Sequence, residues 1–229
     1  MKKSIRMMAG LAIAAISCLA ITSCGGGAGS ATESKFFGNV PGIYLQIMET
    51  SNALKEQFKT SSSEDDAKKV MAKAEKAEQE YSAKIEEAAQ SLDGKTISIE
   101  SDSQFTVNSP VTLTFDGFQS KTDLTPRFKL SGDIVAGSDY QSEAAKGLSG
   151  STASKYVGMA EHVYIVGKDA EGNEVFSQKI AYFPGELIGA DQLGVKKGTA
   201  LQLESFTINK HNAEGCTKAV TLHLSYNPQ

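Results

Sequence analysis

The sequence is short of the motifs by which several classes of enzyme are recognised. It contains no His-Glu-x-x-His, no Ser-x-x-Lys pair and no glycine-rich loop of the kind that cradles a phosphate. The segment Gly147–Ser151 comes nearest to a catalytic motif, but Ser151 stands where a nucleophile elbow needs glycine. A site assembled from separate strands would leave no such motif, so an enzyme remains the third of three functional hypotheses.

Histidine and cysteine are also scarce. His162, His211, His223 and Cys216 could hold a soft ion such as zinc or copper if the fold brought them together. Strands that turn polar residues outward explain their spacing as well. Asp169–Glu174 offers several side-chain oxygens, but the ligand spacing of an EF-hand is absent and an ordinary solvated turn is the simpler interpretation. We therefore expect no metal site, no cofactor site and no catalytic residue.

No acidic residue occurs before Glu33, and the start of the chain has the layout of a secretory signal. Positive charge at Lys2 and Arg6 precedes an apolar stretch from Met7 to Thr22. That stretch is about 16 residues long, whereas a membrane-spanning helix needs about 20. No later run is apolar for long enough to stop transfer. Residues 1–23 are therefore expected to be a cleaved signal peptide.

The end of this segment resembles the lipobox of bacterial lipoproteins. Ile21-Thr22-Ser23-Cys24 is an aliphatic residue, two small residues and a cysteine. In that family the peptide is cut before the cysteine and the thiol is acylated, so the resemblance implies lipidation of Cys24 and retention at a membrane. Cys18 is the poorer candidate, because two small residues do not precede it. The alternative is an ordinary secreted protein in which Cys24 is incidental.

A glycine-rich stretch without periodicity follows Cys24, and such a composition behaves as flexible coil. Residues 24–39 are therefore expected to form a lipidated tether. In lipoproteins of double-membrane bacteria, an aspartate directly after the cysteine favours the inner membrane, and Gly25 stands there instead. The resemblance thus implies a cell-envelope protein on the periplasmic face of the outer membrane.

The composition of the mature chain bears on its partners and on its core. Removal of residues 1–23 takes away three bases and no acid, so the formal net charge changes from −4 to about −7. An acidic chain without a basic stripe is a poor nucleic-acid binder. With Cys24 lipidated, Cys216 is the one cysteine left, so no disulfide can form within the chain. Hydrophobic packing alone must hold the body together.

Residues 40–94 have helical periodicity. Apolar residues recur every three or four positions in two stretches, which predicts two helices. The first stripe is Tyr44, Ile47, Met48, Ser51, Leu54 and Phe58, and the second is Val70, Ala74, Ala77, Tyr81, Ile85, Ala88 and Leu92. Pro41 suits a first helical turn, Ser63 suits an N-cap and Gly94 suits a C-terminal cap. The prediction is an antiparallel helical hairpin with charged outer faces.

From residue 95 to 229 the periodicity becomes two, and turn residues punctuate it. The predicted strands are Thr96–Glu100, Val111–Phe118, Phe128–Val135, His162–Lys168, Glu174–Tyr182, Leu201–Ile208 and Ala219–Tyr226. Val163–Phe176 carries the strongest hairpin signal, with Gly172 in its turn. His211–Cys216 is interpreted as the turn of a C-terminal hairpin. Together these patterns predict an α+β protein in which the helical hairpin precedes an antiparallel β-sandwich.

Three segments resemble the immunoglobulin-like domains of bacterial envelope proteins, including those of the FxLyD type. They are Phe128–Ile134, the Val163–Phe176 hairpin and Val195–Leu201. The resemblance covers about 80 residues, and this chain lacks the aromatic residues that such hairpins carry. It implies an immunoglobulin-like sandwich that serves in binding or scaffolding.

One insertion interrupts the strands, at residues 137–156. A loop of about 20 residues is uncommon in a compact domain unless it is functional or disordered. A short helix around Glu143–Lys146 or a disordered stretch is one interpretation, and a ligand-facing lip is another. Phe183–Lys197 is a second irregular stretch, expected to cap the sandwich or to shape a groove.

The leading functional hypothesis is a membrane-anchored envelope protein that acts as a non-catalytic binding or scaffolding module. Its partners would be the membrane, through Cys24, and another envelope protein that contacts loops or an edge of the sandwich. The alternative is a small-ligand or solute-binding lipoprotein with a pocket between helices and sheet. A concave apolar cavity of about 300 Å³ or more would favour that alternative.

Overall fold

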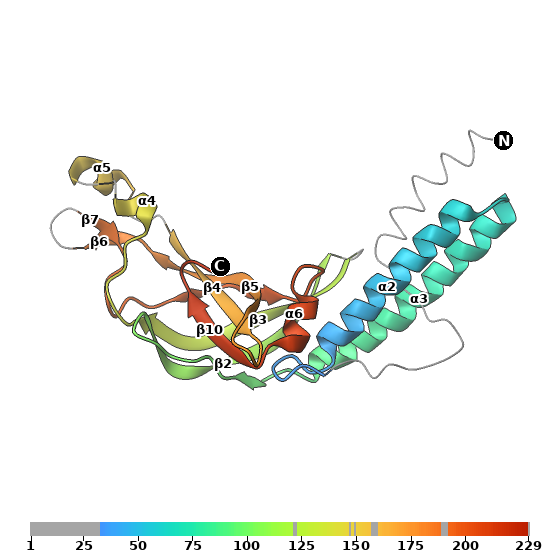
Figure 1. Cartoon of the computed structure of the whole chain (residues 1–229), viewed down its shortest axis with the longest axis horizontal. Helices are drawn as coiled ribbons and strands as arrows, with labels where there is room; N and C mark the ends of the chain where they lie inside the picture. Colours follow the sequence, from blue (N-terminus) through green and yellow to red (C-terminus); the bar gives the residue numbers. More distant parts are fainter. Residues whose placement is uncertain are drawn as a thin grey trace. The chain divides into compact units, whose positions relative to one another are not determined.

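The computed structural model describes residues 33–120, 123–146, 148, 150–156, 160–188 and 192–228. The predicted signal peptide, Cys24 and the tether up to residue 32 lie outside the described residues. Two long helices come first and antiparallel strands follow, as Figure 1 shows. The predicted mixed α+β class is thereby confirmed.

The chain divides into two compact units, each of which is built from three separate stretches of sequence. The first unit contains the described residues up to Leu92, together with Phe115–Arg127 and Thr207–Thr217. The second contains Asp93–Thr114, Phe128–Phe206 and the rest of the chain from Lys218. The units are therefore not two consecutive stretches of sequence.

The first unit is built on the predicted helices, α2 (Val40–Thr60) and α3 (Glu64–Gln90). Pro41 lies in the first turn of α2, where its missing N–H costs no helical hydrogen bond. Ser63 caps α3, because its side chain accepts a hydrogen bond from Asp66 N at 3.1 Å. Gly94 has a φ of 73°, but it lies beyond the cap residue Ser91 and closes the turn that leaves the helix.

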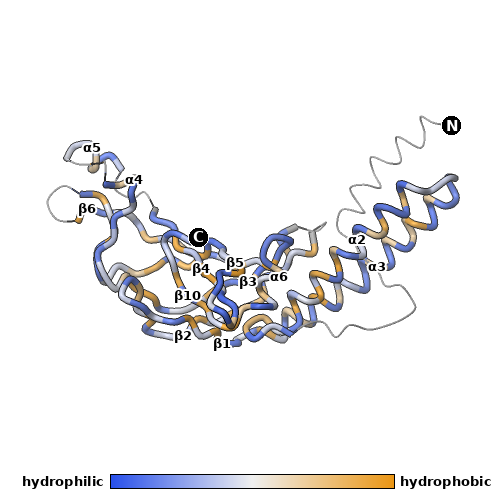
Figure 2. The backbone as a smooth tube through the Cα atoms, in the orientation of Figure 1, coloured by the Kyte–Doolittle hydropathy of each residue, from blue (hydrophilic) through white to orange (hydrophobic). Residues whose placement is uncertain are grey.

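The apolar stripes face each other along the two helices, and Figure 2 shows the apolar and polar positions alternating along both. Leu54, Val70 and Ala74 form one buried cluster, against which Phe58 and Met71 pack. The stripe of α3 differs from the prediction at one position. Ala89, with none of its surface exposed, replaces Ala88 as the buried residue of the last turn.

Within the same unit, α2 also contacts the end of the β2–β3 hairpin. The hydroxyls of Tyr44 and Thr125 lie 3.1 Å apart, and both side chains are buried. Ser34, just before the helix, donates a hydrogen bond to the carbonyl oxygen of Cys216 at 2.6 Å. The base of α2 is thus held by residues far away in sequence.

The strands form two four-stranded sheets and one two-stranded sheet. Their orders are β1-β2-β3-β9, β10-β4-β5-β8 and β6-β7. The strands are β1 Thr96–Ile97, β2 Phe105–Ser120, β3 Asp123–Ala136, β4 Ala160–Lys168, β5 Glu174–Pro184, β6 Glu186–Ile188, β7 Gln192–Gly194, β8 Gln202–Leu203, β9 Ser205–Thr207 and β10 Thr221–Ser225. The β4–β5 hairpin is antiparallel over its whole length, which confirms the strongest local prediction.

The predicted C-terminal hairpin is wrong. Ala213–Lys218 is the short helix α6, and β9 and β10 belong to different sheets. The side chain of Asn212 accepts from Asn209 N and donates to Thr207 O, and its carbonyl accepts from Cys216 N. The turn-like composition of these residues therefore belongs to a hydrogen-bonded turn that leads into the helix.

Two segments pair with strands of both four-stranded sheets. On one side, Ile97 pairs with Val111 of β2, and Glu100 forms a parallel bridge with His223 of β10. On the other, Ala200 bridges to Val135 of β3, whereas Leu203 pairs with Ala181 of β5. The single strand predicted for 201–208 is therefore divided between the sheets.

Aromatic residues join the two sheets inside the second unit. Phe105 of β2 and Phe183 of β5 stack with their ring centroids 6.4 Å apart. Phe176 of β5 and Phe206 of β9 lie 6.1 Å apart. These rings are almost wholly buried, so the sheets share one apolar core.

The insertion at 137–156 contains two short helices, α4 (Glu143–Lys146) and α5 (Gly150–Lys155). The helix expected at 143–146 is confirmed. Ala145 and Ala153 pack with Leu193 of β7 in a small apolar cluster. Through this cluster, the insertion at 137–156 packs against the second irregular stretch, 183–197.

Candidate functional site

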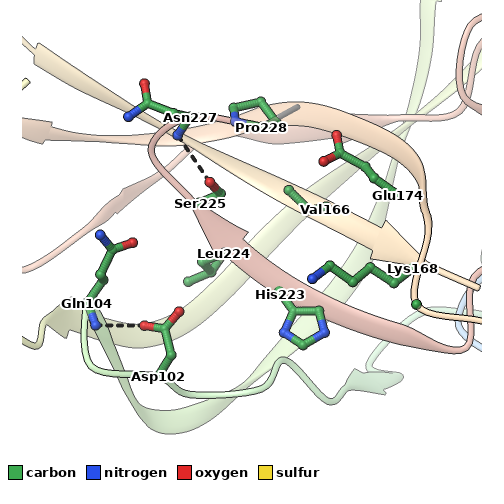
Figure 3. Close-up of a pocket in the computed structure, with 11 residues that line it drawn as sticks. Asp102, Gln104, Val166, Lys168, Glu174, His223, Leu224, Ser225, Asn227 and Pro228 are labelled. Carbon is green, nitrogen blue, oxygen red and sulfur yellow. Dashed lines mark hydrogen bonds between the residues drawn. The ribbon is translucent and has the colours of Figure 1, made fainter. Parts of the chain in front are cut away.

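The main candidate site is a cavity of about 300 Å³ in the second unit, which we call the β10 cavity (Figure 3). It lies between the outer face of β10 and β4 and the loop that precedes β2. Its lining residues are Asp102, Gln104, Val166, Lys168, Gly172, Glu174, His223, Leu224, Ser225, Asn227 and Pro228. Polar side chains dominate this lining, so the cavity has the volume but not the apolar lining that would favour the solute-binding hypothesis.

The alternation of β10 turns its polar residues toward this cavity. Leu222 and Leu224 are buried in the core, so the side chains of His223 and Ser225 lie on the opposite face. His223 Nε2 lies 3.3 Å from Glu100 Oε2 and 3.1 Å from Thr221 Oγ1. The imidazole is therefore held in place by two neighbours.

The loop before β2 folds back on itself beside β10. Asp102 Oδ1 accepts hydrogen bonds from Gln104 N at 2.7 Å and from Phe105 N at 2.9 Å. Asp102 N donates to Phe105 O. Pairing with β10 ends at Glu100, and the cavity occupies the space where the two segments separate. Asp102 is thus anchored through one oxygen at the rim of the cavity.

Lys168 is the cation of the cavity. It pairs across the strands with Glu174, yet no carboxylate oxygen of any described residue lies within 4.0 Å of Lys168 Nζ. Figure 3 shows the ammonium group pointing toward the middle of the cavity, above His223. A cation that faces a hollow without an ion-pair partner attracts a negatively charged group.

The hairpin turn beside Lys168 is fixed by Asp169. Its Oδ1 accepts hydrogen bonds from Glu171 N, Asn173 N and Asn173 Nδ2, and Gly172 adopts a φ of 85°. These bonds, led by that of the Asn173 side chain, lower the pKa of Asp169 below its ordinary value. The carboxylate of Asp169, one of the groups considered for calcium, thus serves the hairpin turn.

The C-terminal wall of the cavity rests on stacked tyrosines. Asn227 N donates to Ser225 Oγ, and Asn227 Nδ2 donates to the hydroxyl of Tyr140 at 2.9 Å. The rings of Tyr140 and Tyr226 are nearly parallel, with centroids 3.6 Å apart. Burial raises the pKa of both phenols. Within the described part of the chain, the buried Tyr226 hydroxyl has no hydrogen-bond partner.

The other residues singled out from the sequence do not converge. His162 and His211 are exposed, on β4 and just before α6. Cys216 is fully buried in α6, and this burial raises the pKa of its thiol. No group of three or more His, Cys, Asp or Glu residues that could hold a metal ion occurs among the described residues. Two residues of the Gly147–Ser151 segment lie outside them.

A second hollow, of about 270 Å³, lies at the tip of the helical hairpin. Asp66 accepts hydrogen bonds there from the hydroxyls of Ser62 and Ser63, and Lys69 lies 3.7 Å from it. The bond from Ser63 is the main cause that lowers the pKa of Asp66. Its acidic group is thus engaged in capping α3.

Sequence reasoning found His223 of the β10 cavity but missed Asp102, Lys168 and Asn227. Its one usable signal was the hairpin register, which predicts that Lys168 and Glu174 are cross-strand neighbours. Nothing in the sequence predicts that the loop at Asp102 lies beside β10, because that contact joins distant parts of the chain.

Comparison with known proteins does not assign the chain to a family, since no family model, no curated protein and no solved structure matches it. In the described residues, no helix has both the length and the apolar composition needed to cross a membrane.

Proposed function

We propose that this protein is a lipid-anchored protein of the bacterial cell envelope whose body is a non-catalytic binding or scaffolding module. The observation that carries the proposal is the sequence Ile21-Thr22-Ser23-Cys24, which follows a basic and then apolar segment and precedes a run of glycines. Acyl chains on Cys24 would anchor the body, and Gly25 after the cysteine favours the outer membrane, facing the periplasm.

The arrangement of the strands supports the binding part of this proposal. Two four-stranded antiparallel sheets share a core of aromatic residues, as in an immunoglobulin-like sandwich, and we propose that the second unit is a variant of that fold. Such domains present loops on a rigid framework, where binding residues gather. We propose that a partner protein in the envelope binds those loops or the helical hairpin.

The anchor is tested by metabolic labelling with radioactive palmitate and by fractionation of membranes. We expect label in the native chain and its loss in Cys24→Ala, with the variant recovered in the soluble fraction. Cys18→Ala is the matched control, since Cys18 lies in the segment that would be cleaved, and it should label like the native chain. Retention of the Cys24→Ala protein in the membrane pellet would refute the anchor.

The partner is tested by crosslinking in cells, followed by mass spectrometry of the purified protein. One envelope protein captured repeatedly from the native chain, but not from Cys24→Ala, would support a module that works at the membrane. Equal capture from both forms would show that binding of the partner does not require the membrane anchor. The crosslinked positions would also show which unit makes the contact.

Solute binding is the second candidate function, and the β10 cavity is the observation that favours it. Its volume of about 300 Å³ lies at the lower end of the range for small-molecule sites. Such a site would lie in the second unit alone, on the outer face of a sheet.

A further inference from the structure

We propose that the β10 cavity binds a small zwitterion, of the class of a free amino acid or a short peptide. The carboxylate would lie at Lys168 and the amino group at Asp102, on the opposite side of the cavity. This inference rests on the proposed function in one respect, since it takes the body to be a binding module. It is independent of the lipid anchor.

The argument begins with the charge of Lys168. Its side chain is only partly exposed, and no described carboxylate lies within ion-pair distance of it, although Glu174 is its cross-strand partner. A surface lysine beside an acid usually closes such a pair, as Lys179 does with Glu204 at 3.3 Å. The ammonium group of Lys168 is thus available to a bound carboxylate, and His223 lies next to it (Figure 3).

A simple anion does not suit the cavity, because Asp102 and Glu174 also line it. Asp102 lies across the cavity from Lys168 in Figure 3, and its Oδ1 is engaged by the two backbone N–H groups of its own loop. Those bonds leave Oδ2 to accept a hydrogen bond from an amine. Opposite charges on opposite walls therefore match a ligand that carries both charges.

The rest of the lining fits a short polar ligand. Gln104, Ser225 and Asn227 add hydrogen-bonding groups to the lining, and the buried Val166 contributes an apolar part of it. No aromatic side chain other than the imidazole of His223 lines the cavity among the residues described there. A sugar ring would thus lack the flat apolar partner on which to stack.

The test is calorimetric titration of the full-length processed protein in detergent. The probes are a mixture of the twenty amino acids, glycylglycine, acetate, ethylamine and glucose. We expect heat from the amino acids or from glycylglycine, and at least about tenfold weaker binding of acetate and ethylamine, because each half-ligand satisfies one wall only. No heat from either zwitterionic probe at millimolar concentration, or binding of glucose alone, would overturn the proposal.

Two variants assign the charges. Lys168→Met removes the charge and keeps most of the apolar stem of the side chain, and Asp102→Asn keeps the acceptor that holds the loop. Each should weaken zwitterion binding about tenfold or more, which is about 1.4 kcal/mol. Lys129→Met, at an exposed lysine of β3, is the control and should bind like the native chain. Binding that survives both charge variants unchanged would place the ligand elsewhere and refute the assignment.

The outcome is separable from that of palmitate labelling. Zwitterion binding without labelling would leave the cavity assigned and remove the anchor. Labelling without zwitterion binding would do the reverse.

Discussion

Gly167 is the position where a single methyl group should disturb the second unit most directly. It lies in β4 opposite Phe176, and the ring of Phe176 covers it. A Cβ added at Gly167 would lie 2.2 Å from one ring carbon of Phe176 and 2.6 Å from the next. The ring cannot simply swing away, because it packs in the core with Phe206. Gly167→Ala must therefore displace a buried aromatic residue.

The expected cost follows from two limits. Insertion of a methyl group into a packed core usually costs about 1–3 kcal/mol. Complete removal of a buried phenylalanine side chain costs about 3–5 kcal/mol, and this sets the upper bound. We expect Gly167→Ala to lower the free energy of unfolding by about 2–3 kcal/mol. Ser177→Ala, at an exposed position of the neighbouring strand, should change it by less than about 0.5 kcal/mol.

The assay is urea unfolding followed by tyrosine fluorescence, which reports mainly on the second unit. A double-mutant cycle sharpens it. In the background of Phe176→Leu, which removes the ring, Gly167→Ala should cost less than half as much as in the native chain, because the clash is gone. An equal cost in both backgrounds, or a native-like midpoint for Gly167→Ala alone, would refute the proposed packing of Phe176 on Gly167.

Three further outcomes follow from buried or hydrogen-bonded side chains. Tyr226→Phe removes a buried hydroxyl that has no hydrogen-bond partner in the described structure, so the free energy of unfolding in urea should stay equal or rise by up to about 1 kcal/mol. A clear loss of stability would show that the hydroxyl does make a hydrogen bond. The pKa of Asp169 is lowered in the folded state, so the stabilising effect of its carboxylate should be complete above the ordinary value of 3.8 and disappear as the pH falls below that value. Asp169→Asn should therefore lose less stability in acid than the native chain. Parallel acid-unfolding curves for the two proteins would contradict this. The buried thiol of Cys216 should react with Ellman's reagent only when urea unfolds the protein, and rapid reaction in native buffer would show that α6 opens.

The helices were predictable because their evidence is local. The apolar stripe through Leu54 and Val70, the cap at Ser63 and the proline near the start of α2 are all properties of neighbouring residues. The shift from Ala88 to Ala89 is a rotation of one position at a helix end, where neighbouring residues decide which alanine is covered.

The positions of most strands were predictable, but their number and their pairing were not, since seven strands were predicted and the described residues form ten. The β4–β5 hairpin was correct because a short turn fixes its register. The segment from Leu201 to Ile208 has the alternation of one strand, yet its backbone divides its bonds, with Leu201 N donating to Ile134 O and Glu204 N donating to Ile180 O. Periodicity reports which face of a strand is buried, and it says nothing about which sheet receives the hydrogen bonds.

The error at residues 211–216 has the same origin. Asn212 and Gly215 are typical of turns, but Asn212 bonds to Asn209 and Thr207 just before α6, and Cys216 enters the core from that helix. The burial of Cys216 depends on the rest of the first unit, so no local pattern could favour the helix over the turn.

The pairing at parts of the sheet edges changes how a partner could bind. Exposed edge strands recruit other chains through unpaired backbone groups. Here Ile97 and Glu100 cover part of the edges of β2 and β10, and the segment from Ala200 to Leu203 covers part of those of β3 and β5. Strand addition along those edges would require these segments to leave, with the loss of backbone hydrogen bonds and of the buried side chains of Ile97 and Leu201. At those positions loops and outer faces are therefore easier for a partner to reach than the strand edges. The proposed ligand of the β10 cavity would enter beside Glu100, where its pairing with β10 ends, without breaking that pairing.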